Sequence, residues 1–316
     1  MAYYLGIDGG GSKTTCVVGD ESSLLAAVTS GGSNITRVGE AGAREALQQA
    51  IREACLAARI NPQQVLCTCI GAAGAGRAEI ASTVRKIVAE IIPGEIEVVG
   101  DMEIALAAAF GKGPGVIVIA GTGSIVFGRD AQGKVARAGG WGFAISDEGS
   151  AHWIGLAAAR AVLRAADEVG EDQAERDPSW PARRLFSELK MAWSLDSLPQ
   201  LARAANANPD FAALFPAVLT AAEAGDVVAR QVIAEASREL AQLAGIVVRR
   251  LFSARHSSAV STSAVPMAMA GGVFRHAAMI RELFYNEVRA ANPDVVLNPE
   301  VVDPVQGALR MARRAW

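Results

Sequence analysis

The sequence predicts an α/β fold made of two related domains that face one another, and three observations support this prediction. First, apolar runs typical of strands alternate with segments of helical periodicity along the first third of the chain. Second, a strand that enters a glycine-rich turn and continues as another strand occurs twice. Third, 316 residues, 51% of them hydrophobic, are enough to form two buried cores.

The N-terminal segment predicts an antiparallel hairpin rather than a strand followed by a helix. Residues 3–7 form an apolar run that enters a glycine-rich turn at 8–13, and the β-branched run 14–18 follows directly. Strand-like runs and helical spacing then alternate. The expected elements are a strand at 24–28, a helix at 40–59, a strand at 65–70, a helix at 80–92, a strand at 96–99 and a helix after Asp101.

The strand, turn and strand of the N-terminus return at residue 116. Residues 116–119 are apolar and enter a turn at 120–124, after which another apolar run follows. The alignment pairs Gly9 with Gly121, Gly11 with Gly123 and Ser12 with Ser124. Because the flanking strands match as well as the glycines, we interpret the two segments as one unit that occurs in two related domains.

The second half of the chain is predicted to be mostly helical. Two polar segments, 170–182 with two prolines and 253–263 with several serines, are expected to be exposed loops. The expected elements are helices at 151–169, 183–193, 198–207 and 227–252, a strand at 265–270, a helix at 274–290 and a terminal helix at 303–316. We expect residues 1–117 and 304–316 in a small first domain and residues 118–303 in a larger second domain.

Composition disfavours several classes of function. The 30 Lys and Arg residues against 33 Asp and Glu residues leave no basic footprint for binding nucleic acid. No run approaches the roughly 18 apolar residues of a spanning helix, and the N-terminus has no signal-peptide pattern. We therefore expect a cytoplasmic protein that binds neither nucleic acid nor membrane. The four cysteines match no disulfide framework and no CxxC motif, which predicts buried thiols.

The two glycine-rich turns match neither of two common phosphate motifs. A P-loop requires adjacent Gly and Lys, but Ser12 separates Gly11 from Lys13. A dinucleotide fingerprint that begins at Gly121 would need glycine at position 126, where Val126 stands. Glycine turns nevertheless let backbone N–H groups approach an anion closely. Two related turns that carry Ser and Thr hydroxyls predict one shared phosphate site.

Two aspartates end predicted strands close to these turns. Asp8 would meet the phosphates of a bound ligand, and two negative groups converge only around a cation. Asp8 therefore predicts Mg²⁺ held through water, with an Asx turn as the alternative role. Asp101 follows the strand at 96–99 and opens a helix, and this position by itself indicates an N-cap.

Four motifs together resemble those of the sugar kinase, heat-shock-protein and actin superfamily. Residues 7–14 (IDGGGSKT) resemble its first phosphate motif, residues 119–124 (IAGTGS) its second, and residues 269–274 (MAGGVF) its adenosine motif. Residues 140–150 (GWGFAISDEGS) are similar to the signature of the N-acetylglucosamine kinase and BadF-type ATPase branch. The motifs stand in the family's order, and the likeness spans nearly the whole chain.

The resemblance implies two ribonuclease-H-like (actin-like ATPase) domains that close over ATP and a sugar in the cleft between them. It implies that Asp101, taken with an ordinary pKa near 4, accepts the proton of the attacking sugar hydroxyl. Glu148 either contacts the sugar or opens a helix. The implied nucleotide-binding residues are Gly10, Gly11, Ser12, Lys13, Thr14, Gly121, Thr122, Gly123, Ser124, Gly271 and Gly272. The implied sugar-binding residues are Ser33, Asn34, Asp101, Trp141, Gly142 and Asp147, with Asp8 as the metal ligand.

The activity that the resemblance implies is that of a hexosamine kinase that uses ATP and Mg²⁺. The expected small-molecule partner is N-acetylglucosamine, phosphorylated at its 6-hydroxyl, with glucosamine and N-acetylmuramic acid as alternatives. A BadF-type ATPase regulator or activator is the alternative from a different class. It would need the phosphate turns but no sugar pocket, so the joint presence of Asn34, Asp101 and Asp147 favours the kinase.

Two further expectations come from the same resemblance. The radical-enzyme activators of this branch bind an iron–sulfur cluster through cysteines, and no cysteine follows Ile125 here, which disfavours that activity. The related repressor and glucokinase group has a cysteine-rich zinc motif that this chain also lacks. A homodimer is expected by family analogy alone.

Overall fold

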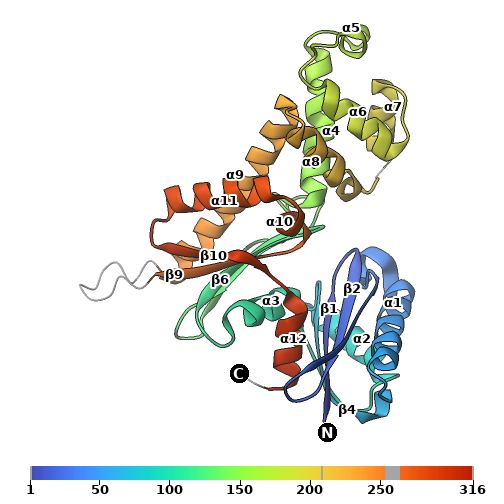
Figure 1. Cartoon of the computed structure of the whole chain (residues 1–316), viewed down its shortest axis with the longest axis vertical. Coiled ribbons are helices and arrows are strands. Elements are labelled where there is room, and N and C mark those ends of the chain that lie inside the picture. The colour runs from blue at the N-terminus through green and yellow to red at the C-terminus, as the bar shows by residue number, and fades with distance from the viewer. Residues whose placement is uncertain (1, 208, 253–263, 315–316) are drawn as a thin grey trace, which may run out of the picture.

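Two lobes make up the molecule, and each is built around a five-stranded sheet (Figure 1). The computed structural model describes residues 2–207, 209–252 and 264–314. The first lobe contains the sheet with strand order β3-β2-β1-β4-β5, and the second lobe contains the sheet with order β10-β9-β6-β7-β8. The two sheets meet through helix α3 (Asp101–Phe110), whose buried side chains pack against both.

The first sheet combines an antiparallel hairpin with two parallel strands. β1 pairs antiparallel with β2 and β2 with β3, whereas β4 lies parallel to β1 and β5 parallel to β4. β1, β2 and β4 have long runs of buried residues, as is typical of strands covered on both faces. The strands are β1 (Tyr3–Gly9), β2 (Lys13–Gly19), β3 (Leu24–Gly31), β4 (Val65–Ala72) and β5 (Glu95–Gly100).

The second sheet repeats this topology strand by strand. β6 pairs antiparallel with β7 and β7 with β8, whereas β9 lies parallel to β6 and β10 parallel to β9. The predicted α/β fold of two related ribonuclease-H-like units is therefore confirmed. The strands are β6 (Gly115–Ala120), β7 (Ser124–Arg129), β8 (Val135–Gly139), β9 (Val265–Ala270) and β10 (Val295–Val302).

The two hairpin turns differ in length. Strand pairing joins Gly9 to Thr14 in the first hairpin and Ala120 to Ser124 in the second. Four residues, 10–13, thus form the first turn, and three residues, 121–123, form the second. The predicted alignment of Gly9 with Gly121 is wrong. Gly9 and Ala120 each form the last strand pair before the turn, so Ala120 is the residue of the second hairpin that is equivalent to Gly9. The prediction aligned the two segments by their glycines, whereas the strand ends define which residues are equivalent.

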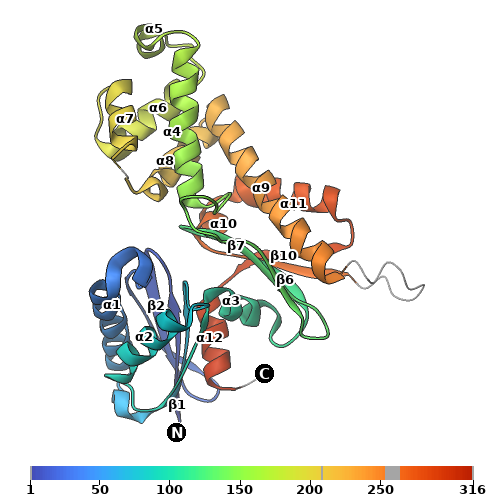
Figure 2. The same ribbon diagram turned by 180° about the vertical axis from the view of Figure 1, so that it is seen from behind.

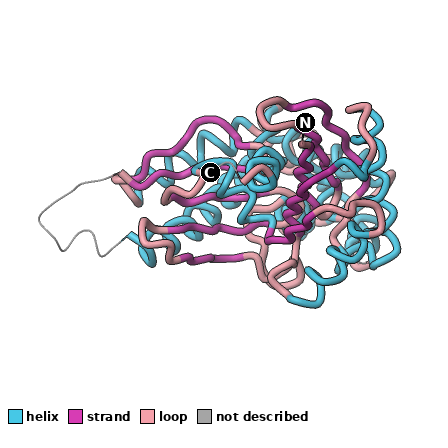
Figure 3. Tube along the Cα trace, turned by 90° about the horizontal axis from the view of Figure 1, so that it is seen from below, coloured by secondary structure: helices cyan, strands magenta, loops and turns pink. Residues whose placement is uncertain are grey.

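Helices cover both faces of the first sheet. α1 (Ile35–Ala57) and α2 (Ala78–Ala89) pack on one face, against residues such as Leu5 and Ile7 of β1. α3 and α12 (Pro304–Ala312) pack on the other face (Figure 2). α12 comes from the C-terminal end of the chain, yet it lies beside the N-terminal strands (Figure 1). Figure 3 marks both ends of the chain in a view from below. The short helix η1 (Pro62–Gln64) precedes β4.

The second lobe adds a helical part to its sheet. The largest hydrophobic core extends from β6 and β9 through these helices. Among the described residues no single helix is long and apolar enough to cross a bilayer; η2–α8 and α9 pass that test only when joined across a 118° bend. The helices are α4 (Ala151–Asp167), α5 (Glu171–Arg176), α6 (Arg183–Trp193), α7 (Leu198–Ala205), η2 (Phe211–Leu214), α8 (Phe215–Glu223), α9 (Val227–Phe252), α10 (Gly272–His276) and α11 (Ala278–Ala291).

The prediction of an exposed loop at 170–182 is wrong in part. Helix α5 forms there, and Trp180 is only 4% exposed. Its indole nitrogen donates a hydrogen bond of 3.1 Å to the carbonyl of Ala165, and its ring packs edge-on against Phe186. A few apolar anchors therefore bury a segment whose average composition is polar.

Other differences concern element boundaries. The predicted helix at 274–290 is broken at Ala277, whose extended backbone separates α10 from α11. β8, β10 and α8 were not predicted; β10 is an edge strand that contains Pro299, a residue that weakens any strand pattern. The predicted loop at 253–263 lies outside the described residues. All four cysteines are buried free thiols, as expected.

Candidate active site

The turns of the two hairpins face each other across the lobes, and their hydroxyl groups touch. Ser12 Oγ and Thr122 Oγ1 share a hydrogen bond of 2.8 Å. In the first turn the N–H of Gly10 donates to the carbonyl of Lys13 at 3.0 Å, and in the second the N–H of Gly121 donates to the carbonyl of Gly123 at 2.9 Å. The structure therefore brings together the two turns that predicted a shared phosphate site.

Residues 32–34 stabilise the first turn through hydrogen bonds. The backbone N–H groups of Ser33 and Asn34 both donate to the carbonyl of Gly10, at 3.1 and 3.2 Å. The hydroxyl of Thr14 donates to the hydroxyl of Ser33 at 2.8 Å, and both side chains are buried. The side chains of Thr14 and Ser33 thus stabilise the turn. Their predicted contacts with nucleotide and sugar stay predictions.

Asn34 has a structural role that leaves part of its side chain for a ligand. It is the N-cap of α1, and its Oδ1 accepts hydrogen bonds from the backbone and the hydroxyl of Thr36 at 3.0 and 2.7 Å. Because both bonds use the carbonyl oxygen, the amide Nδ2 is the group that could donate to a sugar hydroxyl.

Asp8 ends β1 in an acidic environment. Burial, together with the charges of Asp101 and Asp303, raises the pKa of Asp8 to about 7, while Lys13 and Arg275 oppose the shift. The carboxyl group of the ligand-free protein therefore titrates near neutrality. A bound cation or a proton is needed to neutralise the charge of Asp8 among its acidic neighbours.

Asp101 opens α3 but does not cap it. The cap position is Gly100, whose N–H donates to Glu103 Oε1 at 2.9 Å. Asp101 Oδ1 accepts from the N–H of Met102 at 2.9 Å. Burial raises the pKa of Asp101 and the Met102 N–H opposes the shift, so the ordinary pKa expected from the sequence is corrected upward.

Asp147 joins the second turn to the loop at 140–150. Its carboxylate accepts hydrogen bonds from the N–H groups of Gly142 and Ser124, which oppose the larger increase of its pKa by burial. A Cβ at Gly123 would lie 2.7 Å from Asp147 Oδ2, so only glycine leaves room for this carboxylate. Asp147 also has a left-handed backbone, with φ of 64°, a strain of order 1 kcal/mol that recurs at functional sites.

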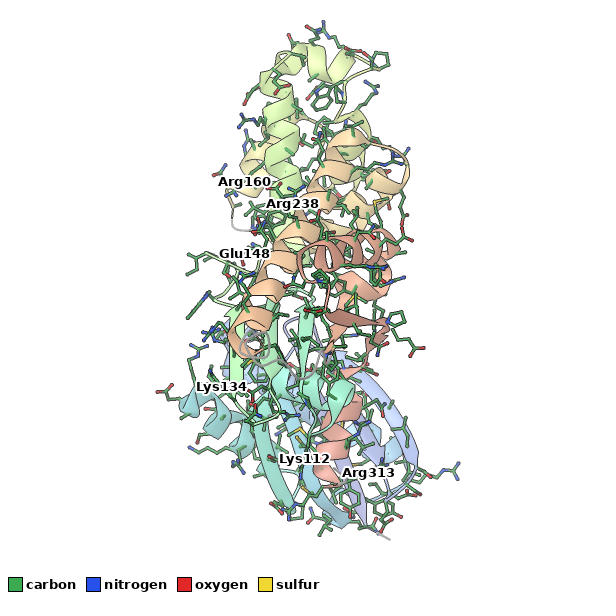
Figure 4. The ribbon with its side chains drawn as sticks, turned by 90° about the vertical axis from the view of Figure 1, so that its left-hand side faces the viewer. Lys112, Lys134, Glu148, Arg160, Arg238 and Arg313 are labelled. Atoms are coloured by element: carbon green, nitrogen blue, oxygen red, sulfur yellow. The ribbon has the colours of Figure 1, made fainter. Side chains whose placement is uncertain are left out.

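The remaining residues of this loop differ in exposure. The side chain of Trp141 is exposed, and the guanidinium of Arg137 stacks on its ring at 4.0 Å. Glu148 does not cap the following helix, because Ser150 does so; its carboxylate instead accepts from the hydroxyl of Ser146 at 2.9 Å. Figure 4 shows Glu148 where the helices of the second lobe meet its sheet.

The two glycines of the predicted adenosine motif have different reasons to be glycine. Gly271 has φ of 99°, and a Cβ there would overlap the carbonyl of Ala120 at the end of β6. Its lack of a side chain is required for backbone packing. A Cβ at Gly272 would meet only His276, at 3.9 Å, so the backbone of Gly272 is the part of this motif that a ligand can approach.

The donor set around Asp8 fits Mg²⁺ that arrives with a nucleotide. Within residues 2–207, 209–252 and 264–314, no three Asp, Glu, His or Cys side chains lie close enough to bind a metal ion by themselves. Mg²⁺ commonly takes one or two carboxylates and fills its other positions with water and phosphate oxygens. Asp8, beside two phosphate turns, supplies such a carboxylate.

Four charged residues near the turns were not predicted. Arg275 Nη2 lies 3.9 Å from Asp303 Oδ1, and the charges of both residues act on Asp8. Arg37 on the first turn of α1 forms an ion pair of 2.9 Å with Asp210 of the second lobe. Their positions in the sequence could have pointed to the two arginines: Arg37 stands three residues after Asn34, and Arg275 stands three residues after Gly272.

Asp8→Asn is expected to stabilise the ligand-free protein in a pH-dependent way. The folded-state pKa of Asp8 is raised above its unfolded value of 3.8, so its contribution to stability is lost as pH rises from about 4 to about 7. Asn carries no proton to lose. The urea midpoint of the variant should therefore match that of the wild type at pH 4 and exceed it increasingly up to pH 7. A difference between midpoints that is constant with pH would contradict the assignment.

Comparisons with known proteins agree with this geometry. The chain matches the BadF/BadG/BcrA/BcrD ATPase family over residues 5–312. It is 34% identical over 316 residues to the N-acetylmuramic acid/N-acetylglucosamine kinase of Clostridium acetobutylicum, with 99% of each chain covered. It is 28% identical over 321 residues to the N-acetyl-D-glucosamine kinase of Dictyostelium discoideum, with 98% of this chain and 97% of that protein covered.

A solved structure shows the same fold. The proposed N-acetylglucosamine kinase of Chromobacterium violaceum superimposes with a TM-score of 0.74 at 24% identity, and the match covers 99% of both chains. The family match spans both phosphate turns, the loop at 140–150 and α12, and so confirms the resemblance found in the sequence. The chain belongs to the BadF/BadG/BcrA/BcrD ATPase family.

Proposed function

We propose that this protein is an ATP-dependent kinase of an amino sugar, with N-acetylglucosamine as the first candidate and its 6-hydroxyl as the acceptor. The observation that carries the proposal is the convergence of Asp8, Asp101 and Asp147 on the two facing turns, close enough for their charges to interact. A nucleotide switch would use the turns and Asp8 but would have no need of two further carboxylates. The names of the two curated relatives support an amino sugar as substrate.

The two turns are suited to bind the phosphates of the nucleotide. Their backbone N–H groups and the hydroxyls of Ser12 and Thr122 supply donors, Lys13 supplies a charge, and Asp8 holds Mg²⁺ through water. When bound, ATP supplies the transferable phosphoryl group and Mg²⁺ neutralises its charge. Gly272 leaves its backbone open on the side that we assign to the adenosine.

Asp101 is the residue that we assign to proton transfer. Its carboxylate accepts the proton of the sugar 6-hydroxyl while the sugar oxygen bonds to the γ-phosphorus and the bond from phosphorus to the bridging oxygen of ADP breaks. The raised pKa of Asp101 makes it a stronger proton acceptor than an ordinary carboxylate. Positioning and charge neutralisation still supply most of the acceleration.

The sugar would lie between Asn34 of the first lobe and Asp147 of the second. The amide of Asn34 donates to one hydroxyl, the carboxylate of Asp147 accepts from others, and Trp141 offers an exposed ring beside them. Closure of the domains, which we place at residues 1–117 with 304–316 and at 118–303, would exclude water so that the sugar receives the phosphoryl group.

The test is ADP release with ATP and Mg²⁺ in the presence of N-acetylglucosamine, glucosamine, N-acetylmuramic acid or glucose. We expect strong turnover on one hexosamine and slow hydrolysis without sugar. The 6-deoxy form of the preferred sugar should be inert, which tests the acceptor position. Rapid hydrolysis that no sugar changes would contradict a kinase.

A nucleotide-dependent regulator is the second candidate. The assignment of this chain to a family named for ATPases favours it, since such a protein needs nucleotide but no sugar. All four cysteines are buried in the first lobe, however, so none of them is placed to share a cluster with a partner. Retained ATP binding with no turnover on any of the four sugars would move the assignment to this class.

A further inference from the structure

An ion pair joins the lobes beside the first phosphate turn. Arg37 lies on the first turn of α1, three residues after Asn34, and its Nη2 is 2.9 Å from Oδ2 of Asp210. Asp210 directly precedes η2 in the helical part of the second lobe. Figures 1 and 2 both show the N-terminal end of α1 directed at this part of the second lobe.

The guanidinium of Arg37 also flanks the turn itself. A Cβ built at Gly11 would lie 3.7 Å from Arg37 Nη1 and 3.8 Å from the Cβ of Thr122. Arg37 and the second turn therefore both lie close to Gly11. Together with the Ser12–Thr122 hydrogen bond, this gives two polar contacts between the lobes at the same turn.

On the second lobe, a series of contacts connects Asp210 to the second phosphate turn. Asp210 Oδ1 accepts from the N–H of Ala212 at 3.2 Å, which fixes the start of η2. The ring of Phe211 packs edge-on against His152 at 5.4 Å, and the N–H of His152 donates to the carbonyl of Thr122 at 3.3 Å. Asp210 is thus connected, through Phe211 and His152, to the turn that faces Gly11.

We propose that Arg37 and Asp210 form a positioning pair that holds the first phosphate turn against the second lobe and so determines how completely water is excluded during phosphoryl transfer. This inference rests on the proposed kinase function. The two side chains are 34% and 50% exposed, and such pairs contribute a factor of about two to five to an equilibrium. A contact of this strength biases closure without preventing the lobes from opening for substrate.

The first test is a double-mutant cycle with Arg37→Gln and Asp210→Asn. Asn at 210 keeps an oxygen that can cap η2, so this variant removes the charge and leaves the cap. Each single change should lower kcat/KM for the sugar about three-fold and raise the ratio of ATP hydrolysis to sugar transfer. The double variant should be no worse than either single variant, and roughly 0.5 M salt should remove the advantage of the wild type.

The matched control is Arg44→Gln. Arg44 lies on the same helix and pairs with Glu40 and Glu90, both within the first lobe. Breaking this pair removes an exposed ion pair of α1 without touching the contact between lobes. Its transfer rate, its hydrolysis ratio and its salt dependence should equal those of the wild type.

A measurement that does not depend on sugar phosphorylation separates this proposal from the proposed function. Small-angle X-ray scattering with Mg²⁺ and a non-hydrolysable ATP analogue should give a larger radius of gyration for Arg37→Gln and Asp210→Asn than for the wild type or Arg44→Gln. Such an increase supports the pair even if no sugar is phosphorylated. Equal radii together with additive effects in the cycle would overturn it.

Discussion

Asp101→Asn is expected to lower sugar phosphorylation by about 10²–10⁴-fold while nucleotide binding is retained. The variant keeps the size of the side chain and keeps an oxygen that accepts from the Met102 N–H at the start of α3. What it removes is the oxygen that accepts the hydroxyl proton. Because Asn is neutral, nucleotide phosphates meet less repulsion, so the dissociation constant of the Mg²⁺ nucleotide should not rise.

The matched control for this variant is Glu103→Gln. Glu103 lies two residues after Asp101 on the same helix and accepts from the N–H of Gly100, a bond that Gln can also accept. The Glu103→Gln variant loses one negative charge, as Asp101→Asn does. Single-turnover measurement of sugar phosphate, with nucleotide binding followed by calorimetry, separates the two. Similar turnover losses in both variants would show that local charge, rather than a proton acceptor at 101, determines the rate.

Gly307→Ala is expected to destabilise the first lobe by about 1–3 kcal/mol. Gly307 is buried in α12, where this helix crosses α3. A Cβ there would overlap the carbonyl of Ile104 and lie 2.7 Å from the N of Ala108. Both obstacles are backbone atoms, so the helices must separate. The intrinsic helix preference of alanine, roughly 1 kcal/mol over glycine, offsets only part of this cost.

The consequence of Gly307→Ala reaches the active site through α3. This helix carries Asp101 at its first residue and packs against both sheets. We expect a lower unfolding midpoint together with lower turnover. Gly76→Ala is the control, since no atom lies within 4 Å of a Cβ built there. If the two substitutions had equal unfolding midpoints, the close crossing of α12 and α3 would not contribute to stability.

The sequence by itself determined the fold class and the identity of the turns. β-branched runs on both sides of a glycine turn predict a hairpin because both signals are local, and the second copy at residue 116 made the two lobes visible. Helix ends followed equally local signals: the predicted bounds of α6 and α9 coincide with those observed. The ends of predicted strands located Asp8 and Asp101, whereas the resemblance of residues 140–150 to a family signature located Asp147.

Only the tertiary structure decided how these residues are used. Burial of Thr14 against Ser33, the hydrogen bond of Trp180 to Ala165, and the contact of Arg37 with Asp210 all join residues that are distant along the chain. The raised pKa of Asp8 depends on Asp101 and Asp303, neither of which is near it in sequence. Desolvation and charge interactions depend on distances in space. Periodicity and spacing report neighbours along the chain, so they predict which groups are present but not which of them meet.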